Sequence, residues 1–163
     1  MAQIIKQRMA AEADGSFVLF LIGMRVNRWW KVWKWWPVAT AMPRMIIELY
    51  KNPELGMLHA QTLFAFPNIV VMQYWRSFED LEAYAKDKYR AHLPAWQAFN
   101  KSIGSDGDVG IWHETYLISP GQYENVYNNM PAWGLGVAGT LHEAKGPRAS
   151  AGKRLKATLP DPS

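Results

Sequence analysis

The sequence predicts an α+β fold: a ferredoxin-like βαββαβ unit with a C-terminal extension, forming a dimeric α/β barrel with a second copy. Four stretches rich in branched and aromatic residues, 16–27, 57–66, 69–76 and 108–118, are typical of strands. Segments with helical spacing separate the first two strands and the last two. This order, with a hairpin at its centre, is the split βαβ arrangement.

The prediction of a dimer rests on the first strand. Its residues 17–24 form an uninterrupted apolar run, which is typical of a strand buried on both faces. Two helical segments cover only one face of a four-stranded sheet. We therefore expect the sheet of a second subunit to cover the other face, in a homodimer. The alternative is a monomer that folds its C-terminal extension over that face.

The first helix is expected to begin near Pro37 and to end at Asn52-Pro53. Its second proline, Pro43, is expected to bend or break the first turns. Ser77 followed by Asp80 resembles a capping box and predicts the start of the second helix.

A further helical stretch follows the second helix, with His92, Trp96 and Phe99 at i, i+4 and i+7. The turn at 104–107 leads into the fourth strand, and residues 123–128 could add a fifth strand at the edge.

The length of 163 residues suits one domain. We expect residues 1–15 to form a flexible arm, 16–142 the ferredoxin-like domain and 143–163 a disordered basic tail. The tail holds five basic and two acidic residues, so it carries +3 of the +4 formal charge. The net positive charge therefore comes mainly from the tail and does not indicate a basic binding face. We expect no nucleic-acid partner.

Composition excludes several kinds of site. The chain has no cysteine, which excludes disulfides, zinc–thiolate sites, iron–sulfur clusters and a cysteine nucleophile. Its longest apolar run is too short to span a bilayer, and the polar N-terminus lacks the apolar region of a signal peptide. We expect a cytoplasmic protein.

Histidine is the strongest candidate for a base or a metal ligand. His92 lies on an apolar helix face, as a satisfied structural residue, a catalytic base or a haem ligand. On the fourth strand, alternation places His113 on one face and Glu114 on the other. A buried Glu114 needs a partner such as Arg25 or Arg76, and a structural ion pair is favoured over a catalytic acid.

The end of the first strand adds Asn27 and Arg25 on one face, where they could orient a substrate or stabilise reduced oxygen. The commoner role of an asparagine at this position is to cap the end of the strand. Candidate catalytic residues are therefore His92, His113, Asn27 and Arg25. Aromatic side chains that could line a hydrophobic small-molecule site are Trp75, Trp96, Trp112, Tyr74 and Trp30. Tyr74 and Trp75 are adjacent on a strand, so one of them should face the helices.

The segment Trp29–Trp36 concentrates tryptophan between Arg28, Lys31 and Lys34. Such rings suit the mouth of a hydrophobic pocket or a dimer contact. A peripheral contact with a membrane surface is the alternative.

Four segments, 20–28, 74–81, 107–116 and 123–131, resemble in order the motifs of one family. It is the fumagillin-pathway monooxygenase-like family, formerly a domain of unknown function, of the antibiotic-biosynthesis-monooxygenase superfamily. The resemblance covers roughly residues 15–140 and implies a dimeric α/β barrel.

A weaker resemblance is to the IsdG-type haem-degrading monooxygenases. Asn27-Arg28, Trp75 before Ser77, and His92 follow the order of their motifs, although Pro94 departs from the pattern. This resemblance implies haem with His92 as axial ligand.

Three functional hypotheses follow. The first is a monooxygenase without metal or flavin, in which His92 or His113 deprotonates an electron-rich substrate that then reduces dioxygen. The second is a haem-binding protein with His92 as axial ligand. The third is a non-catalytic module that binds a small molecule or a membrane interface.

Overall fold

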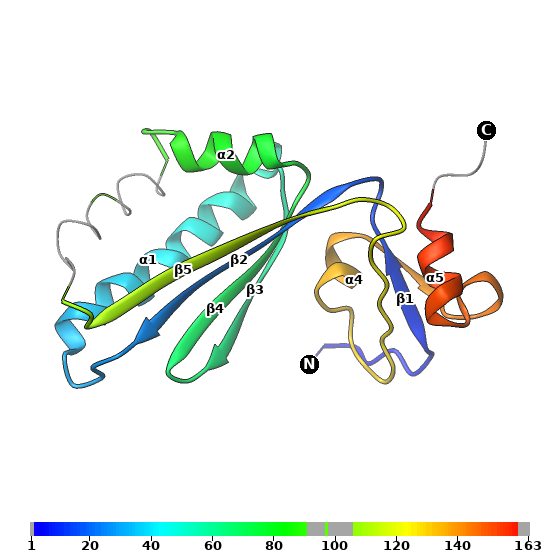
Figure 1. The fold of residues 1–163 in the computed structure, drawn as a ribbon, viewed down its shortest axis with the longest axis horizontal. Coiled ribbons are helices and arrows are strands. Elements are labelled where there is room, and N and C mark those ends of the chain that lie inside the picture. Colours follow the sequence, from blue (N-terminus) through cyan, green and yellow to red (C-terminus); the bar gives the residue numbers. More distant parts are fainter. Residues whose placement is uncertain (1, 91–96, 98–105, 160–163) are drawn as a thin grey trace.

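The structure is a computed structural model that describes residues 2–90, 97 and 106–159 (Figure 1). In chain order, its strands and helices are β1 (Met9–Glu12), β2 (Phe17–Val26), α1 (Val32–Lys51), β3 (Met57–Ala65), β4 (Asn68–Trp75), α2 (Phe78–Lys86), β5 (Val109–Ile118), α4 (Leu135–Ala138), β6 (Thr140–Glu143) and α5 (Ala151–Ala157).

The ferredoxin-like unit is confirmed. Its antiparallel sheet has the strand order β3-β4-β2-β5, so the first and third strands of the unit are central. Both described helices of the unit, α1 and α2, lie on the same side of this sheet (Figure 1). We call the side that they cover the helix face and the opposite side the open face.

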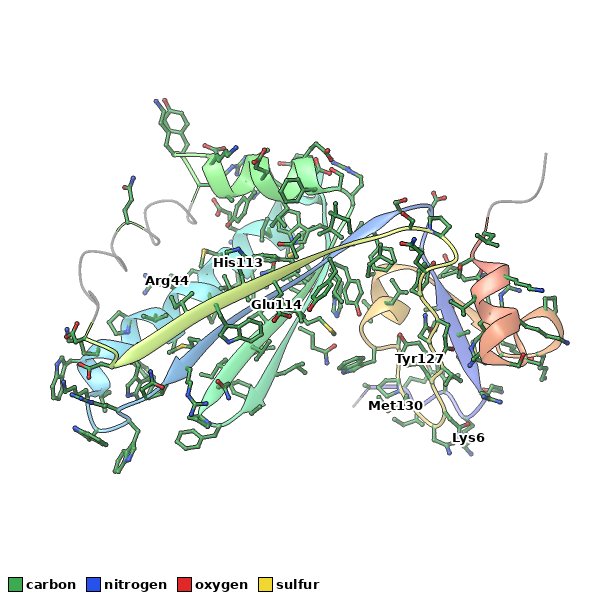
Figure 2. The ribbon with its side chains drawn as sticks, viewed as in Figure 1. Lys6, Arg44, His113, Glu114, Tyr127 and Met130 are labelled. Atoms are coloured by element: carbon green, nitrogen blue, oxygen red, sulfur yellow. The ribbon has the colours of Figure 1, made fainter. Side chains whose placement is uncertain are left out.

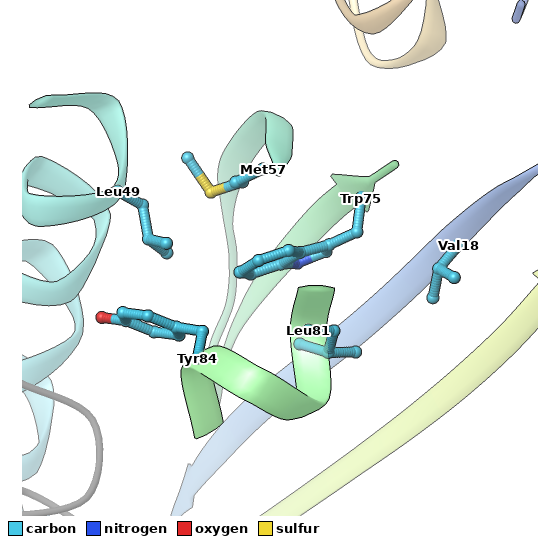
Figure 3. Close-up of a cluster of buried hydrophobic side chains, with 6 residues drawn as sticks. All are labelled: Val18, Leu49, Met57, Trp75, Leu81 and Tyr84. Carbon is cyan, nitrogen blue, oxygen red and sulfur yellow. The ribbon is translucent and has the colours of Figure 1, made fainter. Parts of the chain in front are cut away.

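The helix face holds the main core (Figure 3). Trp75 is 0% exposed and packs with Leu49 from α1 and with Leu81 and Tyr84 from α2. The hydroxyl of Ser77 accepts a hydrogen bond from the backbone N–H of Asp80, so the predicted cap starts α2 and sets Leu81 and Tyr84 against the sheet.

Helix α1 begins five residues before the predicted start at Pro37 and continues through Pro43 without a break. Contacts distant in sequence hold its first turn. Trp35 packs against Val26 and Val109, and the ammonium group of Lys31 lies 2.7 Å from a carboxylate oxygen of the buried Asp108. These interactions offset the backbone hydrogen bonds that the two prolines cannot donate.

The termini differ from the expected flexible arm at 1–15 and disordered tail at 143–163. Strand β1 pairs antiparallel with β6, and α5 lies inside the expected tail. Two guanidinium groups anchor this extension, Arg148 on Glu12 and Arg154 on Glu124. The proposed edge strand at 123–128 is reduced to a single bridge between Met9 and Tyr127.

The extension covers one end of the open face. Leu135 of α4 packs in a cluster with Phe17, Met72 and Tyr74, which point away from the helices. At this end, the cover is therefore the chain's own extension rather than a second subunit, as in the alternative weighed above. The strands β2 and β5 continue beyond the extension (Figure 1).

No helix in the described part of the chain is long and apolar enough to cross a membrane.

Candidate functional site on strand β5

Strand β5 presents a different set of side chains on each face. In the pairing with β2, His113 lies opposite Ile22 and Glu114 lies opposite Leu21. His113 alternates with Ile111, which packs in the core beneath α1, so His113 is on the helix face. Glu114 is on the open face. Figure 2 labels both side chains.

Two of the described histidines have polar partners. The Nδ1 atom of His59 lies 3.0 Å from the hydroxyl of Tyr50, and partial burial lowers the pKa of His59. His142 lies with its Nε2 atom 3.5 Å from a carboxylate oxygen of Glu12. Both therefore have structural partners.

His113 differs from these two because it makes no hydrogen bond or ion pair within the described residues. Its imidazole is exposed and lies against the ring of Phe20, with ring centroids 5.7 Å apart. Its cross-strand neighbour Ile22 is partly buried. Thr115, two residues along on the same face, supplies a hydroxyl. The result is an imidazole without a polar partner among the described residues, beside an apolar surface formed by Phe20 and Ile22.

Glu114 is not in the buried ion pair that the sequence favoured. It is exposed, and its carboxylate accepts a hydrogen bond of 2.6 Å from the Tyr116 hydroxyl. This bond raises the pKa of Tyr116. The predicted partners are engaged elsewhere, Arg25 with Asn27 and Arg76 with Asp80. A tyrosine two residues from an acid on a strand is the signal that sequence reasoning missed.

Arg25 and Asn27 are tied into the structure at the end of β2. The Nε–H of Arg25 donates to the Asn27 side-chain oxygen at 3.0 Å, and the Asn27 amide donates to the Gly107 carbonyl at 3.0 Å. Arg25 lies opposite Gly110, three residues along β5 from His113, about 10 Å away. Arg25 is also on the other face, so the structure does not bring these two residues to His113.

The aromatic candidates are spread over the molecule. Trp75 is sealed in the core, where its indole N–H donates to Gln73. Tyr74 is buried beneath the extension, and burial raises its pKa to about 12. Trp112 lies across Gly23 on the open face, so closely that a side chain at Gly23 would collide with it. Trp30 is exposed in the loop before α1.

A shallow groove of about 590 Å³ lies along β2 and β5 beside the extension. Its lining is mostly apolar and comprises Leu19, Leu21, Thr115, Tyr116, Leu117, Ile118 and Gln122. Leu19, Leu21, Tyr116 and Ile118 belong to the open face, so the groove offers apolar surface on the part of that face that the extension leaves uncovered. Thr115 and Leu117 border the groove from the other side of the edge strand β5.

His92 and Trp96 lie outside the described residues. Within the described residues, no three acidic or histidine side chains gather in a way that could hold a metal ion.

Comparisons with known proteins identify a family and a curated relative. The model of the family "Monooxygenase af470-like" matches residues 17–135, more than half of the chain. The chain is 26% identical over 157 residues to monooxygenase af470 of Aspergillus fumigatus, covering 79% of this chain and 53% of that protein. The chain thus spans about half the length of this curated relative.

Among solved structures, the chain is similar to aldoxime dehydratase in complex with butyraldoxime, with a TM-score of 0.64 and 13% identity, over 80% of this chain and 41% of that one. A second aldoxime dehydratase structure gives a TM-score of 0.64 and 15% identity, over 80% and 42% of the two chains. At such identities, the likeness shows the fold.

Proposed function

The chain belongs to the af470-like monooxygenase family, and we propose that it is a monooxygenase acting on a small hydrophobic molecule. The observation that carries the proposal on this chain is His113, the described histidine left without a polar partner, on the apolar wall beside Phe20. Family membership supplies the reaction type, and His113 supplies the group that moves a proton.

In this mechanism, the substrate rests on Phe20 and Ile22, and Thr115 offers its hydroxyl for orientation. The imidazole of His113 accepts a proton from an acidic O–H or C–H bond of an electron-rich substrate. The electron pair left on the substrate carbon forms a C–O bond with dioxygen, and the peroxide takes back the proton held by His113. The hydroperoxide then loses water to leave a carbonyl at that carbon, so one oxygen atom stays in the product and the other leaves as water. The reaction in this form needs no metal or flavin, because the substrate is the reductant.

Haem is the alternative source of the oxygen chemistry. The imidazole of His113 is a nitrogen donor beside the ring of Phe20, and these two side chains would hold haem if it binds on this face. The axial role that the IsdG-type resemblance implies for His92 remains a proposal. When bound, haem would supply the activation of oxygen itself.

The experiment is oxygen uptake by the purified protein with a panel of phenols, quinols and terpenoids, before and after titration with haemin. We expect uptake that depends on protein and substrate. Uptake without haemin supports the cofactor-free form. A saturable Soret band, with uptake only in the titrated protein, moves the chemistry to haem. No uptake with any substrate in either state contradicts the proposed function.

We also propose that the protein is a homodimer in which a second copy covers the remaining open face. The support is the apolar groove along β2 and β5, where Leu21 and Tyr116 lie next to solvent. Sedimentation velocity tests this: we expect a dimer for the wild type and a monomer for Leu21→Arg. As a control, Ile47→Arg changes an exposed residue of α1 and should stay dimeric. A monomeric wild type contradicts the proposal.

A further inference from the structure

Six exposed aromatic side chains gather at one end of the sheet. Four are indoles from the loop before α1 and the first turns of α1, and two are phenyl rings from the β3–β4 hairpin. They are between 55% and 83% exposed. We call them the aromatic tip: Trp29, Trp30, Trp33, Trp36, Phe64 and Phe66.

Backbone contacts bring these segments to the same end. The N–H of Val26, at the end of β2, donates to the carbonyl of Pro67 in the hairpin at 2.9 Å. Trp35 of α1 and Ile69, at the start of β4, both pack against the cluster that includes Val26. The hairpin and the start of α1 both lie at the end of the molecule opposite the extension (Figure 1).

The other side chains around the start of α1 explain why its four indoles point outward. Trp35 fills the core position, and its indole N–H donates to the Trp29 carbonyl at 2.9 Å. The ammonium group of Lys31 pairs with the buried carboxylate of Asp108, and that of Lys34 pairs with the exposed carboxylate of Asp106. Anchoring of α1 to the sheet therefore uses these residues, and the aromatic tip is not needed for it.

The charge around the tip is positive. Arg25, Arg28, Lys31 and Lys34 contribute four cations, against two carboxylates from Asp106 and Asp108. Counted over these described residues, the end of the sheet that bears the tip therefore has a net charge of +2. Arg28 remains half exposed despite its contact with Asp108, so its charge is presented to solvent.

We propose that the aromatic tip binds the surface of an anionic phospholipid membrane. Indole rings place an apolar body in the interfacial region while the N–H stays near water, and cations beside them attract anionic headgroups. A second copy is a poorer occupant, because two tips of the same positive charge repel each other. The protein lies on the surface rather than across it, since no described helix could span a bilayer.

Flotation tests the proposal with vesicles of phosphatidylcholine alone and of phosphatidylcholine with phosphatidylserine. We expect the wild type to float with the anionic vesicles and to be released by high salt. Trp33→Ala/Trp36→Ala should bind at least about tenfold more weakly, since two interfacial anchors are lost. The control Tyr89→Ala removes a more exposed aromatic ring that lies after α2 and should float like the wild type.

A measurement on the wild type guards against a variant that fails to fold. Lipids brominated along their acyl chains should quench part of the tryptophan fluorescence when the protein is added to anionic vesicles. The proposal is overturned if the wild type does not float or is not quenched. It is also overturned if the folded double variant floats equally well, or if the substitution only abolishes self-association.

Discussion

The two faces of the four-stranded sheet are built from alternate residues of the same strands, yet they differ in what they bury. On the helix face, Trp75, Leu49 and Tyr84 form a core with little exposed surface. On the open face, the extension covers Phe17 and Tyr74 but leaves a groove farther along β2 and β5. The sheet therefore has one face covered by helices and one face covered in part.

Strand β5 lies at the edge where the two faces diverge. Toward the helices, it carries core residues at its start and the exposed His113 in its middle. Toward the open face, it carries the hydrogen-bonded pair of Glu114 and Tyr116. Polar groups thus occupy the positions where neither the helices nor the extension seals the sheet, and these are the positions available for chemistry or for a partner.

The largest effect on stability is expected at the centre of the helix face. Trp75→Ala should lower the free energy of unfolding by about 3–5 kcal/mol, because it leaves a large cavity beneath α2. Urea unfolding measures this. Trp36→Ala, an exposed position on α1, is the control and should change stability by less than about 0.5 kcal/mol. A small effect of Trp75→Ala would show that the helix face is not the main core.

The next largest loss of stability is expected where the extension meets the open face. Leu135→Ala should lower the free energy of unfolding by about 2–3 kcal/mol, since Leu135 is buried against Phe17 and Tyr74. The matched control on the same helix is Val137→Ala, because Val137 is exposed. Equal unfolding midpoints for the two variants would mean that the extension does not pack on the sheet.

A smaller effect on stability, which depends on pH, is expected within the extension. The hydrogen bond from Arg148 lowers the pKa of Glu12, whose carboxylate also faces His142. The folded state therefore favours charged Glu12, and this stabilisation is present above the ordinary pKa of 4.5 and lost as pH falls through the lowered value.

Arg148→Met should lower the free energy of unfolding by about 1 kcal/mol at neutral pH, and by progressively less as the pH falls. Urea unfolding at several pH values checks the trend. Lys145→Met, which removes a highly exposed pair with Glu143, is the control and should show almost no difference. A cost that stays constant down to acid pH would contradict the role of Glu12.

The smallest effect is expected for the hydrogen bond on the open face. Tyr116→Phe should change stability by no more than about 0.5 kcal/mol, because both partners are exposed. In an alkaline titration followed by phenol absorbance, the amplitude that ionises above the ordinary tyrosine pKa of 10.0 should be smaller by one tyrosine in Tyr116→Phe than in the wild type. If the variant instead loses one tyrosine's amplitude at the ordinary pKa, the pair does not exist in solution.

Local patterns predicted much of the fold. Alternation placed His113 and Glu114 on opposite faces of β5, and it placed Tyr74 and Trp75 on opposite faces of β4. The capping residue Ser77 marked the start of α2. These features depend on residues close in sequence, and for that reason they can be inferred without the structure.

The features that escaped prediction depend on distant residues. Strand β1 pairs with β6 from the other end of the chain, and the expected arm and tail carry no periodicity that shows this. The early start of α1 depends on Asp106 and Asp108, more than seventy residues later. For the candidate site, the types of residue were predictable, but the separation of Arg25 from His113 required the strand register.

The most direct test of the central claim compares two neighbouring residues on opposite faces of β5. Both His113 and Glu114 are exposed, so His113→Asn and Glu114→Gln should both fold. With a substrate that supports oxygen uptake, we expect His113→Asn to lower kcat/KM at least about 100-fold and Glu114→Gln to stay within a few-fold of wild type. Full activity in His113→Asn, with loss in Glu114→Gln, would place the chemistry on the open face and contradict the account.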